Sequence, residues 1–179
     1  MSFKHIAAVG AVAAAIAAAP ASAAVNLVVN GSFESGLSGW TLTNPPASFP
    51  ATAIFYNSAT PYPTGAFGEA VPPQNAPTNS PDPVGQRAAY FVSDFSSNET
   101  LSQLVHLTAG VYQIGFSAYA PANGYANAGD AQFEGIVASL TLASYSVSAG
   151  AVTTWQTFAG AANIVADGFY TVSFSFSTM

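Results

Sequence analysis

The chain has 179 residues, with 2 basic and 8 acidic side chains, a formal net charge of −6 at pH 7 and no cysteine. Because phosphate binding needs a basic surface, this charge excludes nucleic acid as a partner and disfavours attachment to anionic lipid. Without cysteine there is no disulfide bond, thiol nucleophile or thiolate metal site. The length fits one domain with a targeting segment.

The first 23 residues have the pattern of a secretory signal peptide. Residues 6–19 are almost wholly Ala, Val and Ile, Pro20 ends the run, and Ala21-Ser22-Ala23 supplies a small-residue cleavage site. The apolar run is shorter than the roughly 20 residues that span a bilayer, which disfavours a membrane helix. We therefore predict a helical signal peptide at residues 1–23, cleavage after Ala23, and a secreted or cell-surface domain at 24–179.

The mature chain opens with a turn signal between two predicted strands, at residues 26–29 and 40–43. Asn30-Gly31 favours a turn because both residues tolerate positive φ. Gly36 and Gly39 then allow a tight return that brings Trp40 back against the first strand.

Residues 44–86 differ in composition from the rest. Ten of the twelve prolines lie between positions 45 and 83. Since proline removes donors from a sheet, we predict a long loop region here, interrupted by one strand at residues 51–56. A loop of this length is uncommon inside a compact domain unless it is functional or mobile.

From position 87 onward, apolar and polar side chains alternate, the pattern of strands with one buried face. The predicted strands are residues 87–92, 101–107, 111–119, 136–142, 152–158 and 170–176. No mature segment has a helical period, and breakers separate the strands at the spacing of a sandwich. The pattern predicts an all-β, antiparallel β-sandwich.

Several motifs resemble the galactose-binding-like jelly rolls. The opening Asn26-Leu27-Val28-Val29-Asn30-Gly31-Ser32-Phe33-Glu34 with Gly39-Trp40 is very similar to that of carbohydrate-binding modules of families 4 and 9. Further segments that fit, in order, are Leu101-Ser102-Gln103, Leu107-Thr108-Ala109-Gly110-Val111-Tyr112, Trp155 and Tyr170-Thr171-Val172-Ser173-Phe174. The resemblance implies a jelly-roll sandwich over most of the mature chain.

The chain is also similar to exported bacterial proteins of this fold that end in a PEP-CTERM sorting signal. The alanine-rich export signal and Gly68-Glu69-Ala70-Val71-Pro72-Pro73 carry this likeness. Such proteins continue past the strand of Phe174 into a strand with an aspartate pair, a Val-Pro-Glu-Pro motif and an apolar helix. This sequence ends at Met179, so the resemblance implies a truncated chain that lacks its final strand and anchor. The alternative is a sheet closed in some other way.

Glu34 is the candidate metal ligand. In the resembling jelly rolls, the glutamate of this turn helps to hold a structural Ca²⁺, completed by backbone carbonyls and an aspartate of the final strand. Calcium takes 6–8 oxygen ligands, a demand that carboxylates and carbonyls can meet. The alternative is a carboxylate that accepts N–H bonds within its own turn, without metal.

The polar loop after the strand at 111–119 is the candidate ligand site. Its aromatic, amide and carboxylate groups suit a neutral sugar: Tyr119, Asn123, Tyr125, Asn127 and Asp130. Trp40 and Trp155 could also stack on sugar rings, but their place in apolar strands favours core packing.

No catalytic pattern emerges. His106 is the sole mature histidine, which makes neither a metal site nor a triad, and the sequence has no Gly-x-Ser-x-Gly or His-Glu-x-x-His motif. We predict a non-catalytic protein of the cell surface or extracellular matrix that binds polysaccharide. The alternatives are a structural or adhesive matrix protein without sugar specificity and, less favoured, a glycoside-active hydrolase whose paired carboxylates the sequence does not single out.

Overall fold

The computed structural model describes residues 26–56, 60–64, 68, 70–71, 85–92, 98–120, 131–147 and 152–178, with side chains from 154 in the last range. The predicted signal peptide lies outside them. The described residues form nine strands: β1 (Thr41–Thr43), β2 (Thr52–Phe55), β3 (Arg87–Tyr90), β4 (Asn98–Leu107), β5 (Gly110–Ala120), β6 (Ala131–Val137), β7 (Leu140–Ser146), β8 (Val152–Ile164) and β9 (Gly168–Thr178). Nothing in this part of the chain is a helix long and apolar enough to cross a membrane.

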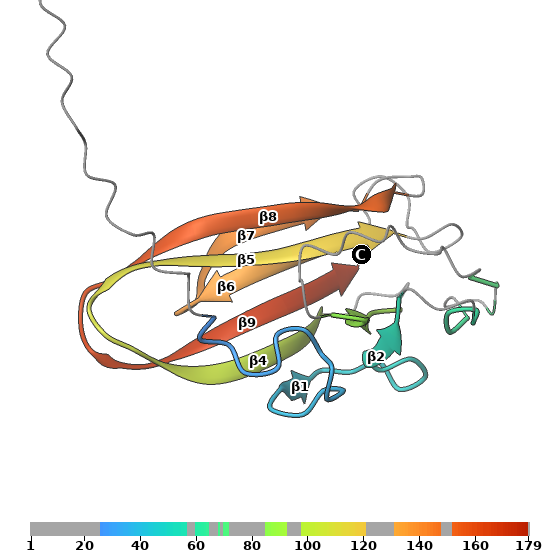
Figure 1. Cartoon of the computed structure of the whole chain (residues 1–179), viewed down its shortest axis with the longest axis horizontal. Helices are drawn as coiled ribbons and strands as arrows, with labels where there is room; N and C mark the ends of the chain where they lie inside the picture. Colours follow the sequence, from blue (N-terminus) through green and yellow to red (C-terminus); the bar gives the residue numbers. More distant parts are fainter. Residues whose placement is uncertain are drawn as a thin grey trace, which may run out of the picture.

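The strands form an antiparallel sandwich (Figure 1). One layer is a five-stranded sheet in the order β1-β4-β9-β6-β7. Two separate pairs, β5-β8 and β2-β3, make up the remaining strands. The predicted all-β sandwich is therefore confirmed, and seven of the nine predicted strands overlap observed ones.

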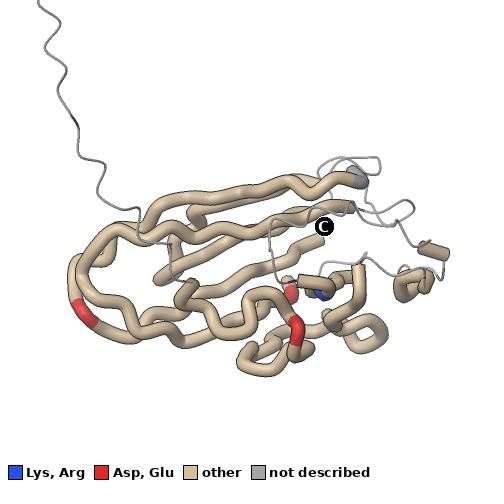
Figure 2. Tube along the Cα trace, in the orientation of Figure 1, with Lys and Arg blue, Asp and Glu red and all other residues tan. Residues whose placement is uncertain are grey.

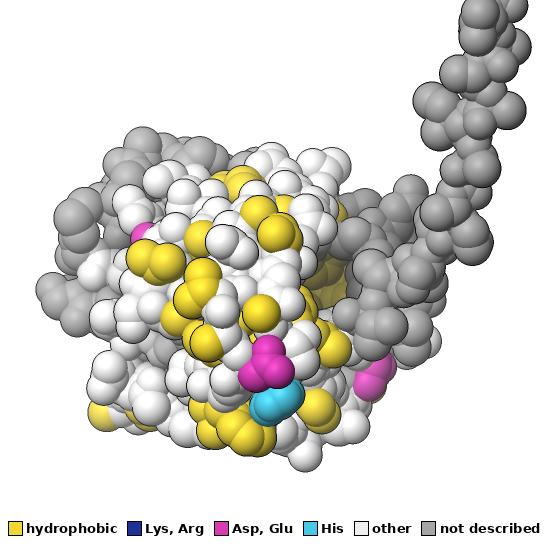
Figure 3. All heavy atoms as spheres, turned by 90° about the vertical axis from the view of Figure 1, so that its left-hand side faces the viewer, with side chains coloured by type: hydrophobic (Ala, Val, Ile, Leu, Met, Phe, Trp, Pro, Cys, Tyr) yellow, Lys and Arg dark blue, Asp and Glu magenta, His cyan; other side chains and the backbone are white. Residues whose placement is uncertain are grey.

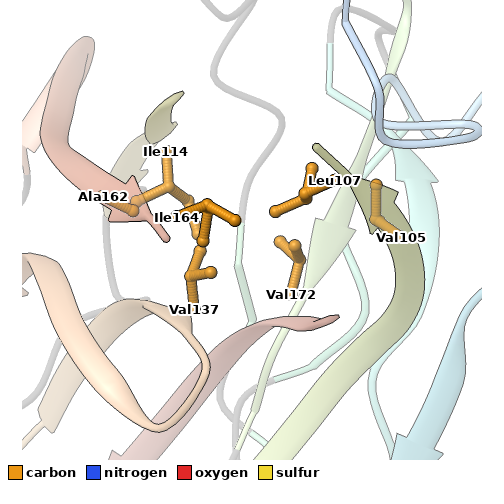
Figure 4. Close-up of a cluster of buried hydrophobic side chains, with 7 residues drawn as sticks. All are labelled: Val105, Leu107, Ile114, Val137, Ala162, Ile164 and Val172. Atoms are coloured by element: carbon orange, nitrogen blue, oxygen red, sulfur yellow. The ribbon is translucent and has the colours of Figure 1, made fainter. Parts of the chain in front are cut away.

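The main core lies between the five-stranded sheet and the β5-β8 pair. Strands β4, β5, β6, β8 and β9 all point apolar side chains into it (Figure 4). Its buried members are Val105, Leu107, Ile114, Val137, Ala162, Ile164 and Val172. Burying a side chain of this size contributes roughly 1.5–3 kcal/mol, so this cluster holds the two layers together.

The predicted first strand at residues 26–29 is wrong. These residues form a bend and a turn, and a side chain satisfies the backbone of Val29. The Val29 N–H donates to Oε1 of Gln103 at 3.0 Å, and Nε2 of Gln103 donates to the Val29 carbonyl at 2.5 Å. The buried amide of Gln103, on β4, thus takes the place of a neighbouring strand.

The predicted single strand at residues 136–142 is also wrong, because the chain reverses there. Ala138 and Ser139 have φ values of 50° and 68°, and Val137 pairs with Leu140 across the turn. Two central residues with positive φ are the mark of the tight turns that match the twist of a hairpin. Ala-Ser lacks the Asn-Gly signature of such turns, so the sequence pattern does not reveal this one.

Gly160 on β8 permits a close approach of β7. A Cβ atom at this position would lie 1.9 Å from the Leu142 carbonyl oxygen, a distance that only a backbone shift can relieve. Gly135 on β6 has more room, since its Cβ would meet side-chain carbons at 3.5–3.6 Å.

We predict that Gly160→Ala lowers the free energy of unfolding by about 3 kcal/mol, the upper range for overpacking. Gly135→Ala serves as the control and should change it by less than about 1 kcal/mol. Urea unfolding of both variants makes the measurement, and equal stabilities would contradict the close contact between β7 and β8.

Candidate functional site

The described residues line a partly open cavity of about 680 Å³ between β3, β5 and the inner face of the five-stranded sheet. Most of its lining is apolar or aromatic, with few polar groups such as Asn26, Ser117 and Thr157. This volume and this lining are typical of sites that bind small molecules.

One end of the cavity is a cluster of aromatic rings, Tyr56, Tyr62, Tyr119 and Trp155, which we name the aromatic end. The Trp155 ring is edge-on to two tyrosines, with centroid distances of 4.5 Å to Tyr119 and 5.1 Å to Tyr56. Strand pairing positions them, because Tyr119 lies near the end of β5 and Trp155 near the start of its partner β8.

Hydrogen bonds fix the tyrosine hydroxyl groups. Tyr62 donates to the Tyr56 carbonyl at 2.5 Å, and Tyr56 donates to the Gly85 carbonyl at 2.6 Å. A hydroxyl carries one proton, so in its contact with Tyr119 the Tyr62 oxygen accepts. Burial, and secondarily this bond to Tyr62, raises the pKa of Tyr119, which keeps its phenol neutral.

The indole N–H of Trp155 has no such partner. Its Nε1 atom is buried and makes no hydrogen bond within the described part of the chain. An unpaired buried donor costs roughly 1–3 kcal/mol. A small shift of the Trp155 ring, which lines the cavity, would expose Nε1 to a ligand oxygen and remove this cost. The aromatic end therefore combines flat apolar rings with one uncommitted donor.

Charge is sparse around the cavity. Arg87 and Glu134 are the two charged side chains among the described residues that line it, and few other described positions carry charge (Figure 2). Within the described chain, His, Cys, Asp and Glu nowhere gather in a group of three that could hold a metal ion. The cavity is suited to a neutral ligand.

The structure places only part of the predicted ligand site. Tyr119 belongs to the aromatic end, whereas Asn123, Tyr125, Asn127 and Asp130 lie outside the described residues and remain a prediction. In the sequence these four residues lie between 3 and 10 positions after Ala120, the last residue of β5.

The two tryptophans have different roles. Trp40 stacks on Phe33 with a centroid distance of 5.5 Å and donates its Nε1 proton to the Asn30 carbonyl, so it fixes the N-terminal turn. Asn30, Gly36 and Gly39 have φ values of 52°, 65° and 85°, which confirms the predicted tight return. Trp155, half-buried, packs in the cluster of the aromatic end. Both tryptophans line the cavity, Trp40 through the N-terminal turn and Trp155 through the aromatic end.

The sequence pattern missed Tyr56 and Tyr62. Tyr56 ends the strand predicted at residues 51–56, and Tyr62 lies in the predicted proline-rich loop, yet they are 3% and 5% exposed. The Tyr56 hydroxyl donates to the Gly85 carbonyl and the Tyr62 hydroxyl to the Tyr56 carbonyl, so these bonds hold both rings in place at the aromatic end. The available signal was a pair of tyrosines in an otherwise polar, proline-rich segment.

The opposite end of the sandwich contrasts with the aromatic end. Hydrophobic side chains gather on its surface beside a histidine and an acidic side chain (Figure 3). The large exposed apolar residues of this part of the chain are Leu104, Val111, Leu140, Val165 and Phe169. His106 packs edge-on against Phe169 at 5.0 Å, far along β4 from the cavity.

Glu34 fastens the N-terminal turn to β3. Its Oε1 atom accepts the backbone N–H groups of Gln86 at 2.7 Å and Arg87 at 2.9 Å. The donors therefore come from a segment 52 and 53 residues further along, not from the turn of Glu34 itself. The described residues around Glu34 furnish no carboxylate cluster that would complete a calcium site, so calcium remains a prediction.

Glu99 is a buried carboxyl group that the sequence pattern did not single out. It is 0% exposed, and its Oε1 atom accepts the Ala51 N–H at 2.6 Å. Its Oε2 atom has no partner within the described chain. Burial raises the pKa of Glu99, while the bond from Ala51 opposes this with a smaller effect.

Comparisons with known proteins show a similar fold. A scan against protein-family models finds no match, and a search of curated proteins finds no relative. The carbohydrate-binding module TmCBM61, solved in complex with β-1,4-galactotriose, is 20% identical with a TM-score of 0.56, over 86% of this chain and 88% of that one. The enzymatically active domain of tailspike protein 4 from bacteriophage CBA120 is 14% identical with a TM-score of 0.52, over 87% of this chain and 20% of that one. These likenesses confirm the predicted jelly-roll fold.

We predict that Glu34→Ala lowers the free energy of unfolding by about 1–2 kcal/mol, because two N–H groups lose a charged acceptor at a solvent-exposed site. Melting temperatures measured with calcium and with a chelator distinguish a calcium ligand at Glu34 from a carboxylate that only accepts backbone N–H bonds. If it is a calcium ligand, the chelator lowers the melting temperature of the wild type and leaves that of Glu34→Ala unchanged. Equal chelator sensitivity of both proteins would contradict a calcium role for Glu34.

We predict that Glu99→Gln removes a pH dependence of stability. A raised folded-state pKa means that the folded protein retains a proton that the unfolded chain releases, so stability falls as the pH rises above the ordinary value of 4.5. One proton gives a slope of at most about 1.4 kcal/mol per pH unit. Urea unfolding between pH 4 and 8 should show this slope for the wild type only; an identical slope in the variant would contradict the assignment.

Proposed function

We propose that this chain is an exported, non-catalytic protein that binds a neutral polysaccharide at the aromatic end of its cavity. The observation that carries the proposal is the buried, uncommitted Nε1 donor of Trp155 among tyrosine rings. A sugar ring presents apolar C–H groups on one face and hydroxyl oxygens at its edge. Aromatic faces can take the first, and an indole N–H can donate to the second.

The electrostatics favour an uncharged sugar over an acidic one. An acidic polysaccharide would need several basic groups, and Arg87 is the one described basic side chain on the cavity. The predicted loop residues Asn123, Tyr125, Asn127 and Asp130 would extend the site by adding amide and aromatic contacts beyond Tyr119.

The likeness to TmCBM61 supports the ligand class, since that protein was solved with β-1,4-galactotriose. This oligosaccharide is therefore the first probe to test, alongside an array of neutral and acidic glycans. Passive binding is proposed because Glu134 is the one described acidic side chain that lines the cavity, whereas glycoside hydrolysis uses a pair of carboxyl groups.

Export and a role at the cell surface or in the matrix rest on the pattern of residues 1–23 and on the motif resemblance. We also propose that the domain is a jelly roll like those of carbohydrate-binding families 4 and 9, of the kind found in PEP-CTERM-type proteins. Glu34 would then help to bind a structural Ca²⁺. The mature protein would then present a rigid sandwich to extracellular polysaccharide.

We predict that Trp155→Phe weakens binding of the best glycan by roughly five- to tenfold, the value of one net hydrogen bond, while an aromatic ring is kept. The control is Tyr112→Phe, which removes a hydroxyl group at the other end of β5 and should leave the affinity unchanged. Titration calorimetry on the array hit makes the measurement. Saturable binding that Trp155→Phe leaves intact would contradict this site, and the absence of any saturable glycan binding would favour the structural matrix protein.

A further inference from the structure

Six aromatic rings line the cavity outside the aromatic end, and each of them packs against the next. In order of contact they are Phe33, Trp40, Phe174, Phe116, Phe133 and Phe91. Successive ring centroids lie 5.5, 5.7, 6.0, 6.4 and 5.3 Å apart. These distances are those of paired aromatic rings, so the six form a continuous surface. We name it the aromatic wall.

The burial of Phe174 shows that the sandwich is hollow beside the aromatic wall. Phe174 lies on β9, the strand that is paired on both edges. Val172 and Phe176 lie two positions to either side, on the same face of β9, and each is 6% exposed. Phe174 between them is only half-buried, as are the other five rings of the wall. The part of its ring that neighbouring side chains leave uncovered therefore faces the cavity.

Polar side chains that line the cavity near the wall are already engaged within the protein. The hydroxyl groups of Ser117 and Thr157 bond each other at 3.0 Å. The Asn26 Oδ1 atom accepts the Val28 N–H at 3.1 Å, and the Trp40 Nε1 proton goes to the Asn30 carbonyl. The wall therefore presents mainly flat carbon surface, in contrast to the aromatic end with its uncommitted Trp155 donor.

Charge and shape define the kind of molecule that the wall suits. Among the described residues that line the cavity, one is basic and one is acidic, Arg87 and Glu134. Since burial of an ion without a partner costs free energy, a neutral molecule is favoured. Flat rings also gain attraction from stacked and edge-on contacts with other rings, beyond the area that they bury. A flexible chain gains less and loses conformational freedom when it is held in one shape.

We propose that the aromatic wall is a second binding site, which takes a neutral, apolar molecule built of flat aromatic rings. The cavity, at about 680 Å³, has the size of sites that bind such small molecules. The two sites share one cavity but differ in chemistry, since the wall recognises its ligand by ring contacts and the aromatic end by a hydrogen bond. This second site does not rest on the proposed binding of glycans.

The test titrates the purified mature protein with N-phenyl-1-naphthylamine, a neutral aromatic probe whose fluorescence rises in apolar surroundings. We expect saturable binding of one probe per protein. The matched control is 8-anilino-1-naphthalenesulfonate, which has the same rings and a sulfonate. It should bind roughly tenfold more weakly, because its charge would be buried without a partner. Equal affinity of the two probes, or the absence of saturable binding, would overturn the proposal.

A competition experiment distinguishes a ring from a chain. Naphthalene should displace the neutral probe, whereas 1-decanol, an apolar molecule with a flexible chain, should be roughly tenfold less effective. Equal displacement by the two molecules would overturn the assignment of aromatic rings in favour of an acyl-chain site.

Nuclear magnetic resonance of the wild type locates the probe. Ring currents of the bound probe should shift the indole N–H signal of Trp40 and the methyl signals of Leu101, since both residues line the cavity. The methyl signals of Leu104, which is 67% exposed and lies outside the lining, should stay in place. Shifts at Leu104, or at Trp155 without Trp40 and Leu101, would overturn the site.

A larger side chain in the cavity gives a second readout. Ala89 lines the cavity two residues before Phe91, so Ala89→Leu should weaken binding of the neutral probe roughly fivefold by taking up space. The control is Ala161→Leu, at an exposed position of β8 outside the lining, which should leave the affinity unchanged. Equal weakening in both variants would contradict the site. If Ala89→Leu does not fold, the resonance shifts of the wild type still decide the question.

The two proposals can fail separately. Glycan binding is measured at the Trp155 signal, and probe binding at the signals of Trp40 and Leu101. A protein that binds the probe and no glycan keeps the aromatic wall and loses the proposed function, and the converse result does the opposite.

Discussion

The pairing of β9 with β4 on one side and β6 on the other is the interaction on which the rest of the structure depends. Its register runs from Gly168 to Ser177 against β4 and from Val172 to Thr178 against β6. Because both edges of β9 are bonded, its backbone can lie at the centre of the sandwich without unpaired polar groups. Its inner face then carries Val172 into the main core, Phe176 into a second apolar cluster with Phe91 and Phe133, and Phe174 to the lining of the cavity. Both the core and the candidate site rest on this one strand.

The candidate site follows from how the other strands are arranged over that sheet. They form two separate pairs, β5-β8 and β2-β3, and residues 87–91 and 115–119 of these pairs line the cavity. At one end of this space the β5-β8 pair brings Tyr119 and Trp155 together, and the proline-rich region adds Tyr56 and Tyr62. Aromatic rings and one uncommitted N–H donor therefore lie together at one end of the cavity.

The alternation of apolar and polar residues was enough to predict the sandwich, because burial of one strand face imposes that pattern. The pattern failed to predict the local structure at two places where the backbone does not follow ordinary strand pairing or turn chemistry. Val29 is bound by the side chain of Gln103, and the turn at Ala138 and Ser139 lacks the usual residues for positive φ. It also missed Tyr56 and Tyr62, since their burial depends on contacts with distant strands. The uncommitted state of Trp155 Nε1 and the burial of Glu99 are likewise consequences of three-dimensional packing that no local pattern reports.

The central claim is that the aromatic end binds a neutral polysaccharide through Trp155. The chain has two tryptophans, so its indole N–H groups give two nuclear magnetic resonance signals at most, and Trp155→Phe assigns them. Titration with β-1,4-galactotriose, or with the best glycan of the array, should move the Trp155 signal saturably. The Trp40 signal should stay in place, because its proton is bonded to the Asn30 carbonyl. A saturating glycan that leaves the Trp155 signal unmoved, or that moves only that of Trp40, would contradict this account.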